Sequence, residues 1–168
     1  MAVFNSLKIN ETLALIMATS LSDSNDTIVS EPGVPYGMSF DVLLQDDFRI
    51  MQLSSLGISQ DLFYGIKDVS PFSLDEWAAF LHISKRTIMR HKNDQKSFEA
   101  LSSDRIIVLS RLLIRGAEVF GTVYKFNLWL RSPVFALGGE LPFNLLKSAT
   151  GIQVIIDELG RIEHGILA

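Results

Sequence analysis

The sequence predicts an all-α protein, with a helix-turn-helix region followed by a small helical module at the C-terminal end. From about Ile58 onward, apolar residues recur at helical spacing almost to the end of the chain. Strand patterns are weak, and no internal repeat is present. We expect helices near residues 59–67, 73–81, 84–92, 103–120, 123–131, 142–147 and 149–164.

Composition narrows the function classes. Hydrophobic residues make up 48% of the 168 residues, and the mean hydropathy is +0.27. No apolar run approaches the roughly 20 residues of a membrane-spanning helix, so surplus apolar surface indicates obligate protein partners and no membrane. The chain has no Cys, which excludes disulfides and thiolate metal sites. The N-terminus does not resemble a secretion signal, and we expect a cytoplasmic location.

Charge is distributed unevenly along the chain. Residues 1–70 carry three basic side chains against nine acidic ones, a net charge of −6. Residues 84–125 carry nine basic side chains against four acidic ones, a net charge of +5. This asymmetry is typical of a local phosphate-binding surface on an acidic protein. A solvated helical face stays open as the alternative for the residues beyond Lys96.

Residues 1–55 are expected to form an acidic, partly mobile N-terminal extension. They contain one short helical candidate, residues 11–21, with Leu13, Ile16 and Met17 on one side. A linker rich in turn-forming residues follows at 22–35. We divide the rest into residues 56–122, the helix-turn-helix with a long helix, and residues 123–168, the C-terminal module.

The segment from residue 73 to 91 predicts the helix-turn-helix. Ser73 and Glu76 have the spacing of a capping box, and an apolar stripe containing Trp77 follows them. His82 and Ile83 form the tight turn, and Ser84 caps the next helix. That second helix is polar and basic, as in helices that enter the major groove of DNA. The candidate DNA-binding residues are Lys85, Arg86, Thr87, Arg90, His91 and Lys92.

Residues 103–120 predict a long helix, with Ser102 or Ser103 as its cap. The helix is apolar on nearly every side, so it must be buried on two faces, either between the two modules or in a dimer seam. Further on, Trp129 buries a large apolar surface, Pro133 ends a helix, Gly138-Gly139 permits a sharp turn and Pro142 starts another helix.

These features together resemble the Xre/ParS family of antitoxins. The resemblance runs from about residue 56 to 168. It is carried by the helix-turn-helix, by Asp104-Arg105 and Ala117-Glu-Val-Phe-Gly121 in the long helix, and by the tail Gly160-Arg-Ile-Glu-His-Gly165. One position differs: Ser148 stands where the family usually has Thr, and it keeps the hydroxyl that caps a helix.

The resemblance implies a toxin-binding C-terminal module whose partner is a RES-domain toxin. Such toxins resemble ADP-ribosyltransferases, which consume NAD or modify proteins with it. The helix-turn-helix would bind operator DNA and repress the shared operon as a homodimer. Neither a cofactor nor a metal is implied. The candidate toxin-binding residues are Trp129, Arg161, Glu163, His164, Ile166 and Leu167.

Competing functions are an enzyme, a stand-alone transcription regulator and an antitoxin that has lost DNA binding. An enzyme is disfavoured because the three histidines show no metal-ligand spacing and no nucleophile–base set. A stand-alone regulator would share the helix-turn-helix but would not need so apolar a C-terminal module. Loss of DNA binding stays open, because an acidic N-terminal region near the basic helix would weaken phosphate binding.

Overall fold

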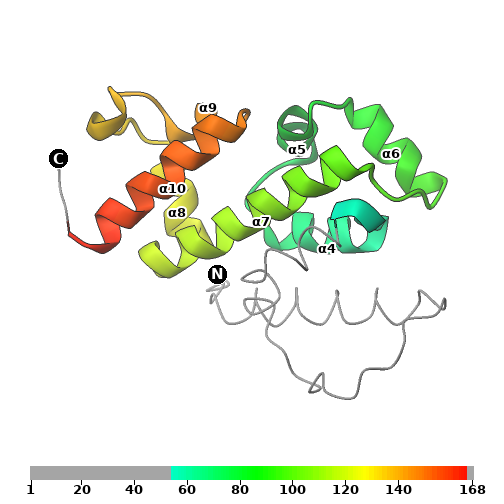
Figure 1. Cartoon of the computed structure of the whole chain (residues 1–168), viewed down its shortest axis with the longest axis horizontal. Helices are drawn as coiled ribbons and strands as arrows, with labels where there is room; N and C mark the ends of the chain where they lie inside the picture. Colours follow the sequence, from blue (N-terminus) through cyan, green and yellow to red (C-terminus); the bar gives the residue numbers. More distant parts are fainter. Residues whose placement is uncertain (1–53, 166–168) are drawn as a thin grey trace, which may run out of the picture.

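The computed structural model describes residues 54–165, and all of its regular elements are helices (Figure 1). The predicted all-α fold class is confirmed. The only strand-like pairing in this part of the chain is an isolated antiparallel bridge between Val134 and Glu140. The predicted helix at 11–21 and the last residues of the tail, 166–168, lie outside the described residues.

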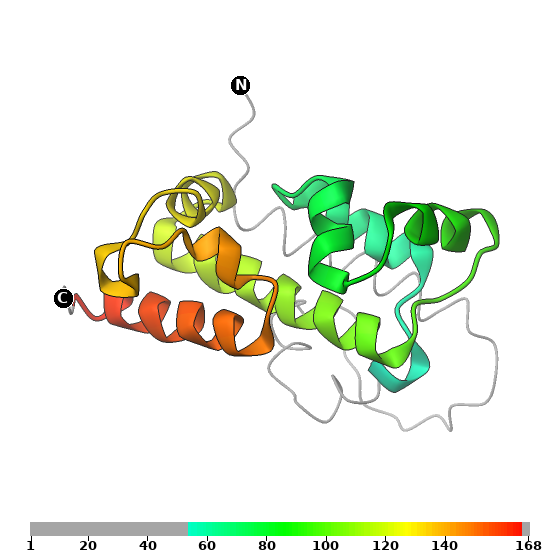
Figure 2. The ribbon, with the colours of Figure 1, turned by 90° about the horizontal axis from the view of Figure 1, so that it is seen from above.

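The helices follow the predicted order, with ends that differ by three residues or fewer. They are α4 (Gln60–Val69), α5 (Leu74–Leu81), α6 (Lys85–Asn93), α7 (Ala100–Phe120), α8 (Val123–Leu130), the short 3-10 helix η1 (Phe135–Leu137), α9 (Pro142–Leu145) and α10 (Ala149–Glu163). Helices α4–α6 lie around the first half of α7, and α8–α10 lie around its second half (Figure 2).

Helix α7 is the central element, and it is buried on two faces as predicted. Its start was predicted wrongly. The helix begins at Ala100, after Glu99, so Ser103 lies inside it and does not cap it. The buried Ser103 hydroxyl accepts a hydrogen bond from the Ile58 N–H (2.8 Å) and donates one to the Phe98 carbonyl (3.1 Å). This hydroxyl therefore links the segment before α4 to the segment before α7.

One continuous core joins the two halves of the molecule. Trp77, fully buried, packs edge-on against Phe63 and Phe72, with ring centroids 5.5 and 6.0 Å apart. The Phe143 ring, from α9 in the other half, lies 5.5 Å from Phe80 and 6.1 Å from Phe72. The division at residue 122 therefore separates sequence regions whose side chains share a core.

Two arginines strengthen the contact between the two halves of the molecule, which we call the joint. The Arg105 guanidinium on α7 donates to the Phe80 carbonyl at the end of α5 (2.6 Å) and to the Lys147 carbonyl just after α9. Arg131, after α8, forms an ion pair with Glu76 of α5 at 2.8 Å. Arg105 thus satisfies carbonyls at two helix ends that have no intrahelical partner.

Within residues 54–165, no helix combines the length and hydropathy that crossing a membrane requires.

Candidate DNA-binding and partner-binding surfaces

Local capping fixes the geometry of α5, the turn after it and α6, the segment predicted to be a helix-turn-helix. The capping box between Ser73 and Glu76 is present at the start of α5, as predicted. His82 ends that helix in the left-handed conformation, with φ of 56°, and its Nε2 lies 2.9 Å from the Lys147 carbonyl oxygen. The Ser84 hydroxyl accepts from the Thr87 N–H at 3.0 Å and caps α6. The turn is therefore held both by local caps and by the C-terminal half.

The Glu76 carboxylate belongs to this capping system and to the joint. Burial alone would raise its pKa, but hydrogen bonds from the Ser73 N–H and hydroxyl and from Arg131 outweigh burial and lower the pKa. The carboxylate is consequently charged at neutral pH, which suits its contact with the N-terminus of α5 and with Arg131.

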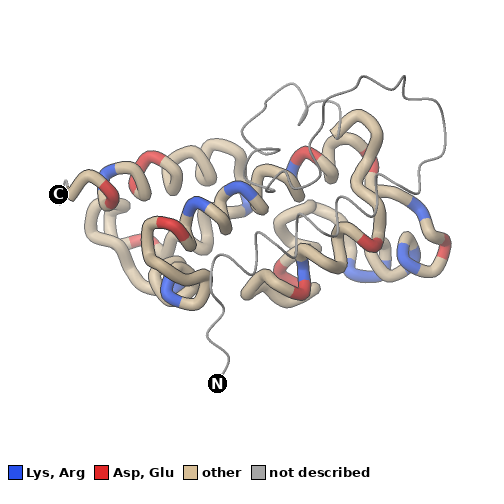
Figure 3. The backbone as a smooth tube through the Cα atoms, turned by 90° about the horizontal axis from the view of Figure 1, so that it is seen from below, with Lys and Arg blue, Asp and Glu red and all other residues tan. Residues whose placement is uncertain are grey.

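The predicted DNA-binding residues on α6 differ in how accessible they are. Arg86 and Arg90 are exposed. Lys85 is exposed but forms an ion pair with Asp75 at 2.8 Å. The Lys92 ammonium lies 4.1 Å from the centroid of the Tyr64 ring. Figure 3 shows the basic residues of α6 at one end of the molecule and further basic residues along α7.

Two of the predicted DNA contacts are less accessible than the sequence suggested. The Thr87 side chain is half-buried, and its hydroxyl lies 2.8 Å from the Ser84 hydroxyl within the cap. His91 is buried, with its ring centroid 5.6 Å from that of Phe98. The expectation that His91 contacts DNA does not fit this placement. The sequence could have indicated this burial, because His91 follows the buried Ile88 by three residues and so shares its face of the helix.

The predicted toxin-binding residues come from two places in the C-terminal half. Trp129 on α8 is half-buried, whereas we expected it to be largely buried. Its ring stacks on Phe126, with centroids 5.9 Å apart, and lies 5.4 Å from Phe120. One edge of this aromatic cluster therefore remains accessible to a partner.

The tail residues are partly built into α10. Arg161 pairs with the buried Glu158 at 2.6 Å, and Glu163 pairs with Arg115 of α7. The contact with Glu163 raises the pKa of Arg115. His164 is exposed at the helix end, and Gly165 follows with φ of 66°, as expected for a helix stop. Ile166 and Leu167 lie outside the described residues.

Three exposed apolar side chains in this half escaped the sequence analysis. Phe135 on η1 is 89% exposed, and Tyr124 and Leu128, four residues apart on α8, are 67% and 49% exposed. The 134–140 loop around Phe135 is closed by hydrogen bonds from the Val134 N–H to the Glu140 carbonyl (3.1 Å) and from the Gly139 N–H to the Val134 carbonyl (2.9 Å). The Gly138-Gly139 pair, which predicts a sharp turn, was the sequence feature that could have pointed to this loop.

Comparison with known proteins finds similarities for this half. A family described as "Antitoxin Xre/MbcA/ParS C-terminal toxin-binding domain" matches residues 115–165. An Antitoxin Xre from Yersinia enterocolitica is 30% identical over 87 residues, which are 51% of this chain and 59% of the relative. The C-terminal part of the chain is therefore similar to the toxin-binding domain of antitoxins of this type. A second Antitoxin Xre, from Photorhabdus laumondii, is 28% identical over 104 residues, 61% of this chain and 70% of the relative.

The chain spans about 59% of the length of the Yersinia enterocolitica relative that it matches. Among solved structures, a chain of the M. tuberculosis MbcT–MbcA toxin–antitoxin complex is 18% identical, with a TM-score of 0.49. That similarity covers 63% of this chain and 94% of the other. The family match runs from the end of α7 through α10, so it includes Trp129, the 134–140 loop with Phe135, and Glu163.

Proposed function

We propose that this chain is an antitoxin that binds and neutralises a cognate RES-domain toxin, which consumes NAD or modifies proteins with it, in the bacterial cytoplasm. The observation that carries the proposal is the match of residues 115–165 to a toxin-binding domain. The same residues include large apolar side chains that are exposed and therefore available to a partner. We place the toxin contact on this half, with the Arg161–Leu167 tail and Trp129 as its predicted members.

Phe135 is the strongest candidate for an anchor in that contact. Aromatic side chains bury large areas at interfaces and are enriched among the residues that dominate binding energy. The hydrogen bonds that close the 134–140 loop hold Phe135 in place before a partner arrives. Such preorganisation lowers the entropy cost of association.

Growth under toxin co-expression tests this assignment. Replacing Phe135 by Asp should abolish rescue of growth, because the anchor would become a charge in an apolar contact. Leu101→Asp is the matched control: Leu101 is 80% exposed at the start of α7 and lies outside residues 115–165. Rescue by Phe135→Asp at the wild-type level would remove η1 from the toxin contact.

We further propose that α6 binds operator DNA and that the chain acts as a homodimeric repressor of its operon. The support is the position of Arg86 and Arg90, both exposed on a capped helix that follows a tight turn. Arg binds guanine in a bidentate manner, and a two-fold dimer reads two half-sites.

Operator titration by fluorescence anisotropy tests the DNA-binding proposal. Arg86→Ala should weaken binding by about 1–3 kcal/mol and relax the preference at one base position. Arg90→Ala should weaken binding to all sequences about equally. Lys125→Ala, which removes an exposed cation from α8, is the control and should bind as wild type does. Wild-type affinity of Arg86→Ala would contradict the assignment.

A stand-alone helix-turn-helix regulator is the second candidate, since it would share α5 and α6. Affinity purification of the tagged chain from its native host distinguishes the two. An antitoxin brings down a second polypeptide encoded beside it, and that polypeptide is lost with Phe135→Asp. A regulator is recovered alone.

A further inference from the structure

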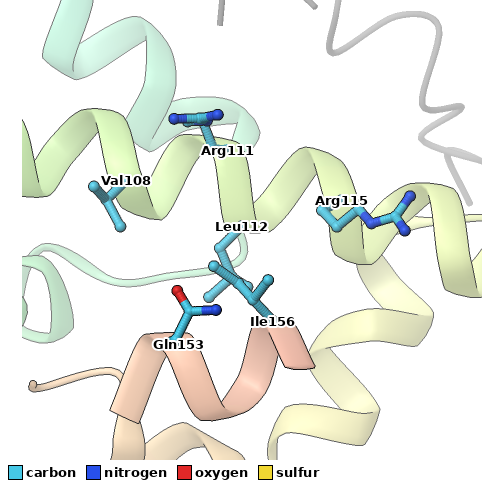
Figure 4. A pocket seen from close by; sticks show the side chains of 6 residues that line it. All are labelled: Val108, Arg111, Leu112, Arg115, Gln153 and Ile156. Atoms are coloured by element: carbon cyan, nitrogen blue, oxygen red, sulfur yellow. The ribbon is translucent and has the colours of Figure 1, made fainter. Parts of the chain in front are cut away.

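A groove between α7 and α10 is lined by none of the residues named above as candidates for binding DNA or the toxin. It has a volume of about 420 Å³. Figure 4 shows its lining, which combines two arginines of α7 with an apolar floor from both helices. The residues are Val108, Arg111, Leu112, Arg115, Gln153 and Ile156. An amphipathic, acidic segment has the chemistry that such a surface recognises.

We propose that the chain's own N-terminal segment, centred on residues 11–31, docks in this α7–α10 groove. Residues 1–53 carry seven acidic side chains against two basic ones, a net charge of −5. Leu13, Ile16 and Met17 form an apolar stripe at helical spacing, and Glu11 and Asp23 flank it with negative charge. The stripe matches the apolar floor, and the flanking carboxylates match the charge of the two arginines, of which Arg115 also pairs with Glu118 and Glu163.

The position of Ser54 leaves the preceding chain long enough to reach the groove. Asp104, Val108, Arg111 and Arg115 are spaced four, three and four residues apart, so they lie along one face of the helix. The Ser54 hydroxyl lies 3.5 Å from Asp104 Oδ1, at the beginning of that face. Seven residues of helix, roughly 10 Å, separate Asp104 from Arg111. The 32 residues between 21 and 54 span many times that distance when extended.

A second copy of the chain is the less suitable occupant. Isologous packing of two such grooves across a two-fold axis would bring the four arginines of the two copies into one interface. Like charges brought together in this way repel each other. The acidic segment, which is joined covalently to the same molecule, has the complementary charge and a high effective concentration.

Paramagnetic NMR on the full-length chain tests the docking. The native sequence has no Cys, so Gln153→Cys provides a single attachment site for a nitroxide at the groove. Amide signals of residues 11–31 should broaden and lose most of their intensity. A nitroxide at Asn93→Cys, at the exposed end of α6, is the control and should leave them sharp. Equal broadening by both labels would overturn the proposal.

Charge variants then test the basis of recognition. Arg111→Glu, and separately Glu11→Gln combined with Asp23→Asn and Asp26→Asn, should each restore the lost signals. The second variant changes only residues outside the described core, so it remains informative if Arg111→Glu affects folding. Arg86→Glu makes the same charge change on α6 and should not restore them. Persistent broadening in both groove-charge variants would contradict the proposal.

A mixed sample distinguishes docking within one chain from docking between two chains. It contains isotope-labelled chain without a nitroxide and unlabelled chain that carries the nitroxide. Broadening in that mixture would place a second copy's segment in the groove and overturn the intramolecular assignment. Sharp signals in the mixture, together with broadening within one chain, are the expected result.

Discussion

The two tryptophans illustrate how different one residue type can be in different surroundings. Trp77 is fully buried, and its Nε1 donates a hydrogen bond to the Ser70 hydroxyl at 3.0 Å. Trp77→Ala should cost about 3–5 kcal/mol of unfolding free energy. The half-buried Trp129 should cost clearly less when changed to Ala, while toxin binding weakens. Urea titrations check this, and equal losses of stability would show that Trp129 is a core residue.

Single residues also show what a sequence can reveal. The burial of His91 follows from its spacing to Ile88, because both lie on one face of α6. The role of Ser103 does not follow from any local pattern. Its partners include Ile58, which is 45 residues away in the chain. Serine before an apolar helix is normally a cap, but Ser103 lies inside α7 and its hydroxyl bonds to the backbone of Ile58 and Phe98.

At the scale of elements, close packing of α7 on α8 depends on a glycine. A Cβ at Gly116 would overlap the ring of Phe126, which is fully buried. Gly116→Ala should therefore destabilise the protein by about 1–3 kcal/mol. Gly160 lies within α10 with no atom near its Cβ position, and Gly160→Ala should stabilise by roughly 0.4–1 kcal/mol. Thermal unfolding measures both, and the same sign for the two would contradict this packing.

The end of α10 sets up a test of the tail. A chain truncated after Glu163 keeps every residue of that helix and the ion pair to Arg115. It should fold and bind operator DNA as the full chain does, but neutralise the toxin poorly because Ile166 and Leu167 are missing. Growth under toxin co-expression gives the answer. Full rescue by the truncated chain would assign neutralisation to the body of the module and Phe135.

The accuracy of the element predictions has a physical source. Helices begin where Ser73, Ser84, Thr122, Pro142 or Ser148 satisfies free backbone groups or fits the first turn, and such residues are visible in a sequence. The η1 helix has three residues and therefore no periodic pattern. For that reason Phe135, the most exposed large apolar side chain of the described residues, was missed.

At the scale of the whole molecule, the shared core predicts one cooperative unfolding transition. The two tryptophans report on different halves, since Trp77 lies in α5 and Trp129 in α8. The Trp77→Phe and Trp129→Phe variants each keep one tryptophan. In each variant, the unfolding transition followed by tryptophan fluorescence should coincide with the transition followed by circular dichroism. Separate transitions by the two methods in either variant would mean that the halves unfold independently.

The joint between the halves was beyond prediction, because its contacts connect residues far apart in the sequence. Arg105 reaches Lys147 across 42 residues, and Arg131 reaches Glu76 across 55. No periodicity or capping pattern encodes such pairs. Only the arrangement of α5, α8 and α9 around α7 brings them together.

This joint also constrains how such proteins can diversify by recombination. A gene fusion that attaches a new C-terminal half at residue 122 would retain Glu76 and Arg105 but replace their partners, Arg131 and the loop at Lys147. The fused protein would be stable only if the incoming half had a cation at the place of Arg131 and an accessible backbone carbonyl at the place of Lys147. Under the proposed function, new toxin specificities should therefore arise more readily by substitutions on the outer face, around Phe135, than by exchange of complete modules.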